Sequence, residues 1–190
     1  GVDGYNAGLR GKKGENYDGG HRAVCFFRWP AANLTGPRVI PAATQVQDLL
    51  PTFIDLLGFR KDKLNAFDGS SLAPLLTKNK PLNDRMFVVQ YGGGTRPEKY
   101  FDCVVWNSWR LVGKDELYNI SADPGQQHNI SKDHPGIMKK MQGFYERWWS
   151  KAGPGIDDFV PVVVGSAHQN VVEMTSDFWA NGDYVNTQWK

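Results

Sequence analysis

The sequence predicts an α/β chain whose second half is an antiparallel α+β subdomain. A short apolar run at residues 23–28, closed by Trp29 and Pro30, is typical of a strand that is buried on both faces. Four β-rich runs occupy residues 86–91, 101–106, 109–113 and 116–120. A long amphipathic helix is predicted after them. At 190 residues the chain is long enough for a core that supports itself.

Before these runs, the chain is predicted to form glycine-rich loops, the buried strand and two helical segments. Residues 1–22 combine glycines with polar residues and have no sustained apolar period, which indicates ordered loops. Thr44 and Gln47 have the spacing of a capping box, and apolar residues then recur at helical spacing up to Gly58. Pro51 is expected to kink this helix or to mark a second start within it. A further helical turn is predicted at residues 71–76.

The β-rich part is predicted to be a meander packed by the long helix. Two-residue steps join its last three runs, so we expect an antiparallel sheet with consecutive strands as neighbours. Asp133 and Pro135 begin the helix, which ends before Gly153. Its apolar residues share one wide face that is expected to cover the sheet: Ile137, Met138, Met141, Phe144, Tyr145, Trp148 and Trp149.

Charge and cysteine patterns exclude several classes of protein. The net charge is +2, and the excess lies in the first thirty residues. Five cations spread over that length are too few for a nucleic-acid surface, so no nucleic-acid partner is expected. No apolar run approaches the length of a membrane span. Cys25 and Cys103 lie in apolar stretches without C-x-x-C spacing, and both are predicted to be buried free thiols.

The candidate chemistry lies in the glycine-rich start of the chain. The four histidines lack metal-site spacing, and no G-x-S-x-G elbow occurs. Glycines surround Lys12 and Lys13, and an ammonium group can hold the oxygens of a tetrahedral anion. The alternative is that both lysines are solvated loop charges and that Arg22 pairs with Asp18.

Residues 8–30, GLRGKKGENYDGGHRAVCFFRWP, resemble a segment of the type I, arylsulfatase-type sulfatases that reads roughly L-R-x-x-K-x-x-x-Y-E-G-G-x-R-x-P before a strand ending in W-P. Further blocks at residues 48–58, 68–76 and 109–129, and the helix ending YERWW, resemble later landmarks of that family in the same order. The likeness covers residues 4–152 and extends faintly to residue 179. Asp18 stands where the family has Glu, and residues 23–24 where it tends to have Val-Pro.

The resemblance implies a sulfate ester hydrolase with an alkaline-phosphatase-like fold. Lys13 falls on the lysine that contacts the sulfate of the substrate, and His21 is a weaker candidate for substrate binding. The family uses a formylglycine made within a C/S-x-P/A-x-R motif, beside calcium, and this motif is absent from the sequence. The chain is therefore expected to be a C-terminal portion of the enzyme, without metal ligands or cofactor of its own and inactive in isolation.

In this interpretation, residues 1–82 are the tail of the large α/β domain, residues 83–152 the small subdomain with its four-stranded sheet and long helix, and residues 153–190 an incomplete extension. Truncation is expected to expose apolar surface around residues 23–27 and 44–58, and to favour self-association. The resemblance also implies a periplasmic or secreted enzyme. A sulfated-glycan-binding or scaffold module, and a related phosphoesterase or phosphonate hydrolase, remain alternatives.

Overall fold

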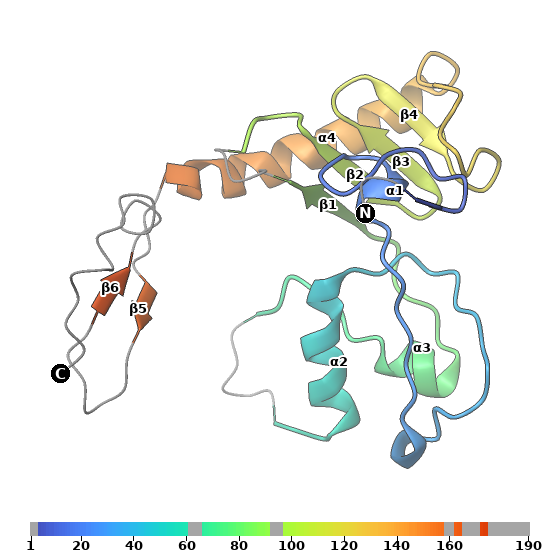
Figure 1. Ribbon diagram of the computed structural model, residues 1–190, viewed down its shortest axis with the longest axis vertical. Helices are drawn as coiled ribbons and strands as arrows, with labels where there is room; N and C mark the ends of the chain where they lie inside the picture. Colours follow the sequence, from blue (N-terminus) through green and yellow to red (C-terminus); the bar gives the residue numbers. More distant parts are fainter. Residues whose placement is uncertain (1–3, 61–65, 92–96, 158–161, 165–171, 175–190) are drawn as a thin grey trace. The chain divides into compact units, whose positions relative to one another are not determined.

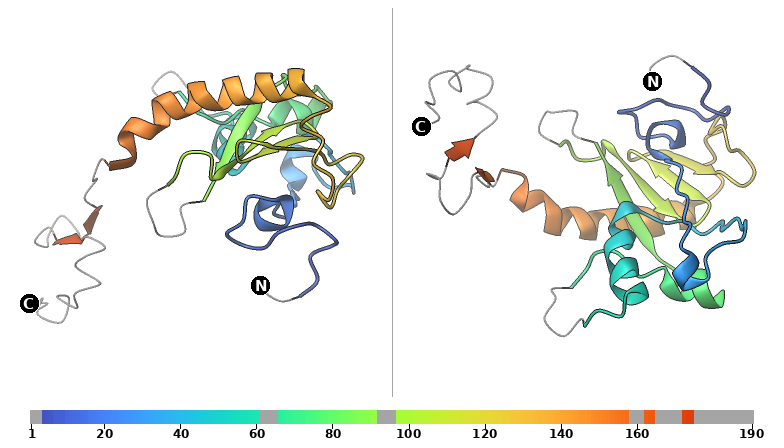
Figure 2. Two further views of the ribbon diagram at one scale, coloured as in Figure 1. Left: turned by 90° about the horizontal axis from the view of Figure 1, so that it is seen from above. Right: turned by 60° about the horizontal axis from the view of Figure 1, so that its bottom comes forward.

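The computed structural model describes residues 4–60, 66–91, 97–157, 162–164 and 172–174 (Figure 1). The chain divides into two compact units, Gly1–Ser150 and Lys151–Lys190. In the first unit, one face of a sheet is covered by a long helix, and N-terminal loops lie over the other face (Figure 2).

The sheet of the first unit has four antiparallel strands in sequence order. The strands are β1 (Met86–Gln90), β2 (Asp102–Trp106), β3 (Trp109–Val112) and β4 (Glu116–Asn119). Asn107 and Gly113 have positive φ values of 50° and 60° at the two tight turns, as short hairpin connections require. The predicted meander is confirmed, with each strand about a residue shorter than expected at one end.

Helix α4 (Pro135–Ala152) packs on one face of this sheet. Met141 and Tyr145 of the helix are buried against Val104, Leu111 and Leu117 of the sheet. The other apolar residues of the predicted stripe pack around this core. The aromatic face of the helix is therefore a packing surface, as its period indicates.

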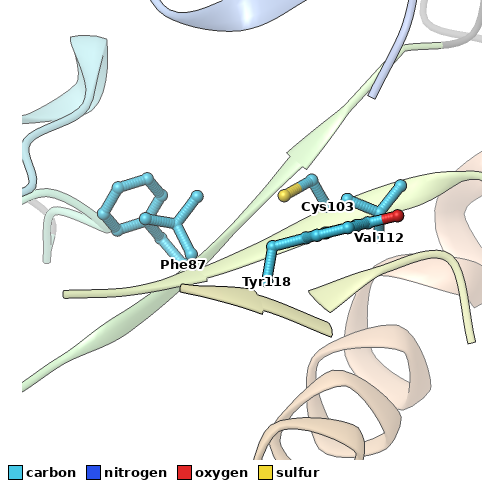
Figure 3. Close-up of a cluster of buried hydrophobic side chains, with 5 residues drawn as sticks. Phe87, Cys103, Val112 and Tyr118 are labelled. Carbon is cyan, nitrogen blue, oxygen red and sulfur yellow. The ribbon is translucent and has the colours of Figure 1, made fainter. Parts of the chain in front are cut away.

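The opposite sheet face carries a second buried cluster (Figure 3). Phe87, Cys103, Val112 and Tyr118 lie in it, and Tyr17 of the N-terminal loops packs against it. Burial raises the pKa of the Cys103 thiol to about 12, so this thiol is an inert core group, as predicted.

Residues 23–29 correct two expectations. They do not form a regular strand, because within the described residues no strand pairs with them beyond a single bridge from Trp29 to Leu34. The rings of Phe27 and Trp29 lie 6.1 and 6.2 Å from that of Phe53. The side chains of residues 23–26 are all exposed, and Phe26 is 92% exposed. The prediction that this segment is a buried strand is therefore wrong for the isolated chain. The prediction that Cys25 is buried is also wrong, because Cys25 is exposed.

The predicted helical segments are present, with different starts. The 3-10 turn η1 (Pro30–Ala32) follows the extended segment, and the turn η2 (Val46–Asp48) leads into α2 (Leu49–Leu56). The capping box joins Gln45 to Asp48 instead of Thr44 to Gln47. Pro51 lies in the first turn of α2, where its missing N–H costs nothing, and Gly58 ends the segment at a φ of +70°. The predicted turn at residues 71–76 is the helix α3 (Ala73–Lys78).

A buried ion pair links the α2 region to the base of the sheet. Arg85, directly before β1, donates from Nη1 to Asp48 Oδ1 at 2.7 Å and from Nη2 to Oδ2 at 2.5 Å. The same carboxylate accepts the backbone N–H groups of Gln45 and Ser70 at 2.9 and 2.8 Å. Its side chain is fully buried, so every oxygen lone pair that it offers is used inside the protein.

The second unit contains the end of α4, a 3-10 segment and a short hairpin. The segment η3 (Gly153–Asp157) follows the helix, and β5 (Val162–Val164) pairs antiparallel with β6 (Val172–Met174). None of the helices in the described ranges has the length and apolarity to cross a bilayer.

Self-association of the isolated chain stays an expectation, now with named residues. Phe26 and Leu50 are 92% and 58% exposed, and burying such side chains between two copies removes apolar area from water. We expect concentration-dependent oligomers in light scattering. Replacing both residues by serine should raise the dissociation constant by about tenfold or more. Val39→Ser, at an equally exposed valine, is the control, and a strictly monomeric wild-type chain would contradict the prediction.

Candidate functional site

Lys13 stands at the tip of a tight turn. The backbone N–H of Glu15 donates to the carbonyl oxygen of Lys12 at 2.9 Å, and Gly14 has a φ of +94°, as the third residue of a type II turn requires. The side chains of Lys12 and Lys13 are exposed. Within the described residues neither has an ion-pair partner. The ammonium of Lys13 is therefore free to meet an anion from outside the chain.

Two glycines close the loop that carries this turn. The N–H of Gly19 donates to the carbonyl oxygen of Arg10 at 2.8 Å. A Cβ on Gly19 would lie 2.4 Å from the carbonyl oxygen of Gly11, and one on Gly20 would lie 2.1 Å from that of Glu15. Because backbone packs on backbone here, a side chain at either position would push the loop open.

A buried ion pair fastens the loop to the sheet. Helix α1 (Asp18–His21) begins at Asp18, whose side chain is fully buried. Arg110 of β3 donates from Nε to its Oδ1 at 2.8 Å. The backbone N–H of Asp18 also donates to Gln126 Oε1 at 2.7 Å. A carboxylate removed from water in this way needs its cation, so the pair holds the loop at one place on the sheet.

A second anchor is built around Arg10. Its Nη1 donates to the hydroxyl of Tyr118 at 2.9 Å, and its Nη2 donates to that of Tyr17 at 2.8 Å. Both hydroxyls in turn donate to Glu116 Oε2. The guanidinium carbon lies 3.8 Å from the centre of the Tyr17 ring. Burial, followed by the hydrogen bond to Glu116, raises the pKa of Tyr118, which keeps its hydroxyl a donor.

Removing the Tyr118 hydroxyl tests this anchor. Tyr118→Phe should lower the free energy of unfolding by about 1–2 kcal/mol, because Arg10 loses an acceptor and Glu116 a donor. It should also speed tryptic cleavage at the exposed lysines of the turn, since local opening exposes the backbone. Urea denaturation and limited proteolysis measure the two effects. Tyr5→Phe, at a tyrosine that is 95% exposed, should change neither.

His21 lies beside the Asp18–Arg110 pair. Its side chain is 14% exposed, and its Nε2 is 3.8 Å from Asp18 Oδ1. Burial lowers the pKa of His21, and the nearby carboxylate offsets part of this effect. Arg22 Nη1 also lies 3.8 Å from Asp18, so the pairing expected from a purely structural interpretation is present. A substrate contact by His21 stays a prediction.

The anchoring residues on the sheet were not singled out in the sequence. Arg110, Glu116, Tyr118 and Gln126 all come from the block at residues 109–129 that carries the family resemblance. The resemblance pointed to this block as a whole. It could not predict which of its residues contact the Lys13 loop, because the contacting residues are about a hundred positions apart in the sequence.

The described residues provide no metal site. No group of three or more His, Cys, Asp or Glu side chains within them could hold an ion. The sequence has no C/S-x-P/A-x-R motif that could yield formylglycine.

A cavity of about 420 Å³ lies elsewhere, between the segment before α2 and the base of the sheet. Neither Lys13 nor His21 lines it. Its walls are formed by residues that include Pro41, Ala43, Leu75, Leu82, Arg85 and Asn107.

Curated relatives of this chain are sulfatases. It is 32% identical to mouse steryl-sulfatase over 133 residues, which cover 70% of the chain and 20% of that protein. It is 34% identical to human arylsulfatase H over 176 residues, with 74% of the chain and 31% of the relative covered. Human arylsulfatase D is 34% identical over 93 residues, 48% of the chain and 16% of the relative. No model of a protein family matches.

The chain belongs to the type I sulfatase family. It corresponds to a C-terminal portion of such a protein, and it spans between about a sixth and a third of the curated relatives named above. Membership of this family explains why the sequence blocks from the Lys13 loop to the end of α4 resemble sulfatase segments in the same order.

Solved structures support the fold of this sulfatase chain. A Bacteroides thetaiotaomicron protein, described with the metabolism of multiple glycosaminoglycans, matches with a TM-score of 0.54 and 21% identity over 75% of the chain and 32% of that structure. The crystal structure of Ps i-CgsB matches with a TM-score of 0.57 and 23% identity, covering 76% of the chain and 32% of that structure. The chain thus shares the fold of about a third of each of these structures, in agreement with a portion of an alkaline-phosphatase-like α/β protein.

Proposed function

We propose that this chain supplies the sulfate-binding lysine of an enzyme that hydrolyses sulfate monoesters. The observation that carries the proposal is the exposed Lys13, which has no ion-pair partner among the described residues and lies at the tip of a turn whose loop is anchored twice to the sheet. The family membership supplies the reaction class, because the curated relatives are sulfatases.

Lys13 would stabilise the negative charge that develops on the sulfate group during the reaction. As the ester bond breaks, negative charge grows on the sulfate oxygens and on the leaving oxygen, and a fixed ammonium stabilises it. The closed glycine loop and the Asp18–Arg110 pair would hold the turn in place, so that little reorganisation is needed at the moment of reaction. Both aryl and carbohydrate sulfates fit this role.

The organisation of the whole protein belongs to the same proposal. Residues 1–82 would complete the large domain and residues 83–152 would form the small subdomain that carries the anchors of the Lys13 loop. The location in the periplasm or outside the cell, and the contact of His21 with substrate, are further proposals from the resemblance.

Hydrolysis of 4-nitrophenyl sulfate tests the function. The intact protein that contains this sequence should release 4-nitrophenol, and the isolated chain should not, because it has no C/S-x-P/A-x-R motif to supply a nucleophile. Turnover by the isolated chain would contradict this assignment. A preference of the intact protein for 4-nitrophenyl phosphate would instead favour the related phosphoesterases. Micromolar binding of sulfated oligosaccharides by the isolated chain would favour a binding module.

A further inference from the structure

A buried imidazole lies next to the ion pair that fastens the Lys13 loop to the sheet. The side chain of His21 is 14% exposed, and its Nε2 atom lies 3.8 Å from Asp18 Oδ1. Nε2 is buried and has no hydrogen-bond partner within the described residues. Buried polar atoms are nearly always hydrogen-bonded, so this nitrogen is an exception. The ring thus lies beside a buried charge without a hydrogen bond that would hold a proton on this atom.

The carboxylate of Asp18 already serves two other cations. Its Oδ1 accepts the Nε proton of Arg110 at 2.8 Å, and its Oδ2 lies 3.8 Å from Arg22 Nη1. Arg110 comes from β3, and Arg22 directly follows α1. Gln126 is uncharged and accepts the backbone N–H of Asp18. In the described part of the chain, the charged groups around His21 and its ion pair are therefore one carboxylate and two guanidinium groups.

A proton on His21 would add a third cation to this cluster. The new charge would be buried, and removal from water disfavours the charged form of an imidazole. Asp18 Oδ1 already binds Arg110, so the imidazolium would compete for that oxygen. Burial has the largest effect on the pKa of His21 and lowers it, Asp18 and the backbone of Asn16 raise it, and Arg110 lowers it further. The result is a lowered pKa, so the closed loop favours the neutral ring.

We propose that His21 is an acid-sensitive latch of the Lys13 loop. The neutral ring packs beside an intact Asp18–Arg110 pair, and protonation favours states in which the loop opens and the imidazolium reaches water. A group whose pKa is lower in the closed loop than in the open loop takes up a proton on opening, so acid shifts the equilibrium toward the open loop. The latch needs no substrate and is independent of any contact between His21 and a sulfate ester.

Hydrogen exchange of the 190-residue chain, followed by NMR, measures loop opening at about pH 7.5 and pH 5.5, on either side of the ordinary imidazole pKa. The reporters are the amides of Gly19 and Gly20, which donate to the carbonyl oxygens of Arg10 and Tyr17. After correction for the intrinsic pH dependence of exchange, their protection factors should fall severalfold in acid. The limit is about tenfold, set by an open-state pKa near 6.5. The amides of β2 and β3 are the reference and should keep their protection.

Histidine variants show which ring is responsible. His21→Gln keeps a polar side chain that cannot be charged, and it should lose the pH dependence. His128→Gln and His134→Gln should keep it, because His128 is 83% exposed and His134 packs on Trp109. The shifts of the His21 ring protons in the wild-type chain give its pKa directly, and this second measurement depends on no variant.

Three results would overturn the latch. They are a His21 pKa of about 6.5 or above, an equal fall of the protection factors in His21→Gln and wild type, and an equal loss of protection in the strand amides. A lowered pKa together with a fall confined to the loop amides of chains that keep His21 supports it. None of these results bears on Lys13 as a sulfate-binding group, which the hydrolysis of 4-nitrophenyl sulfate tests separately.

Discussion

Replacing Lys13 by alanine in the intact protein is expected to lower kcat/KM for a sulfate monoester by about 10²-fold or more. Among the residues that the structure describes, no carboxylate pairs with this ammonium, so its charge is available to a sulfate group. An interaction that strengthens as charge develops lowers the barrier more than it lowers KM. Steady-state kinetics with 4-nitrophenyl sulfate measure both parameters, and most of the loss should fall on kcat.

The neighbouring lysine provides the matched control. Lys12→Ala removes the same charge from the same turn and should leave kcat/KM close to the wild-type value. Lys13→Arg should recover only part of the activity, because a planar guanidinium does not place its donors where the ammonium does. Both lysines are exposed, so the thermal stability of all three variants should match the wild type. Near-normal turnover by Lys13→Ala would remove Lys13 from its proposed role.

Replacing Asp48 by alanine is expected to lower the free energy of unfolding by about 3–5 kcal/mol near neutral pH. The substitution leaves the guanidinium of Arg85 without its partner and frees two backbone N–H groups, those of Gln45 and Ser70. Urea denaturation measures the loss. Glu98→Ala removes an exposed carboxylate and should change stability by less than about 0.5 kcal/mol.

The contribution of Asp48 should disappear in acid. Burial alone would raise its pKa, but the hydrogen bonds from Arg85, Ser70 and Gln45 outweigh burial and hold the pKa below its ordinary value. A carboxyl group whose pKa is lower in the folded protein stabilises it above the unfolded pKa, and this stabilisation is lost as the pH falls through the folded pKa. The difference between wild type and Asp48→Ala should therefore narrow below about pH 4. A difference that is small at neutral pH would show that the ion pair does not join these elements.

The sequence correctly predicted the sheet and the helix that covers it, because hairpins and amphipathic helices are recognised from residues that are close together in the chain. Two-residue turns define hairpins, and an apolar stripe with helical period defines a packing face. The same logic failed for residues 23–28. Their apolar composition describes a strand among other strands, and the described chain provides no partner that pairs along them, so Phe26 stays in solvent.

The capping of α2 shows a related limit. Thr44 and Gln47 have suitable spacing, yet Gln45 and Asp48 form the box, because the carboxylate of Asp48 is also bound by Arg85 and Ser70. Residues far along the chain therefore determine which of the two possible capping boxes forms. The spacing alone fits both pairs equally well.

The amino-acid order alone was enough to identify the family and to predict a role for Lys13, since each block that carries the resemblance consists of residues that are close together in the chain. Only the folded chain showed that Arg110 and Tyr118 anchor the loop of this lysine, and that Tyr91 lies against its turn. These contacts join residues that are separated by roughly eighty to a hundred positions or more, and they exist because a twisted antiparallel sheet brings distant side chains to one face.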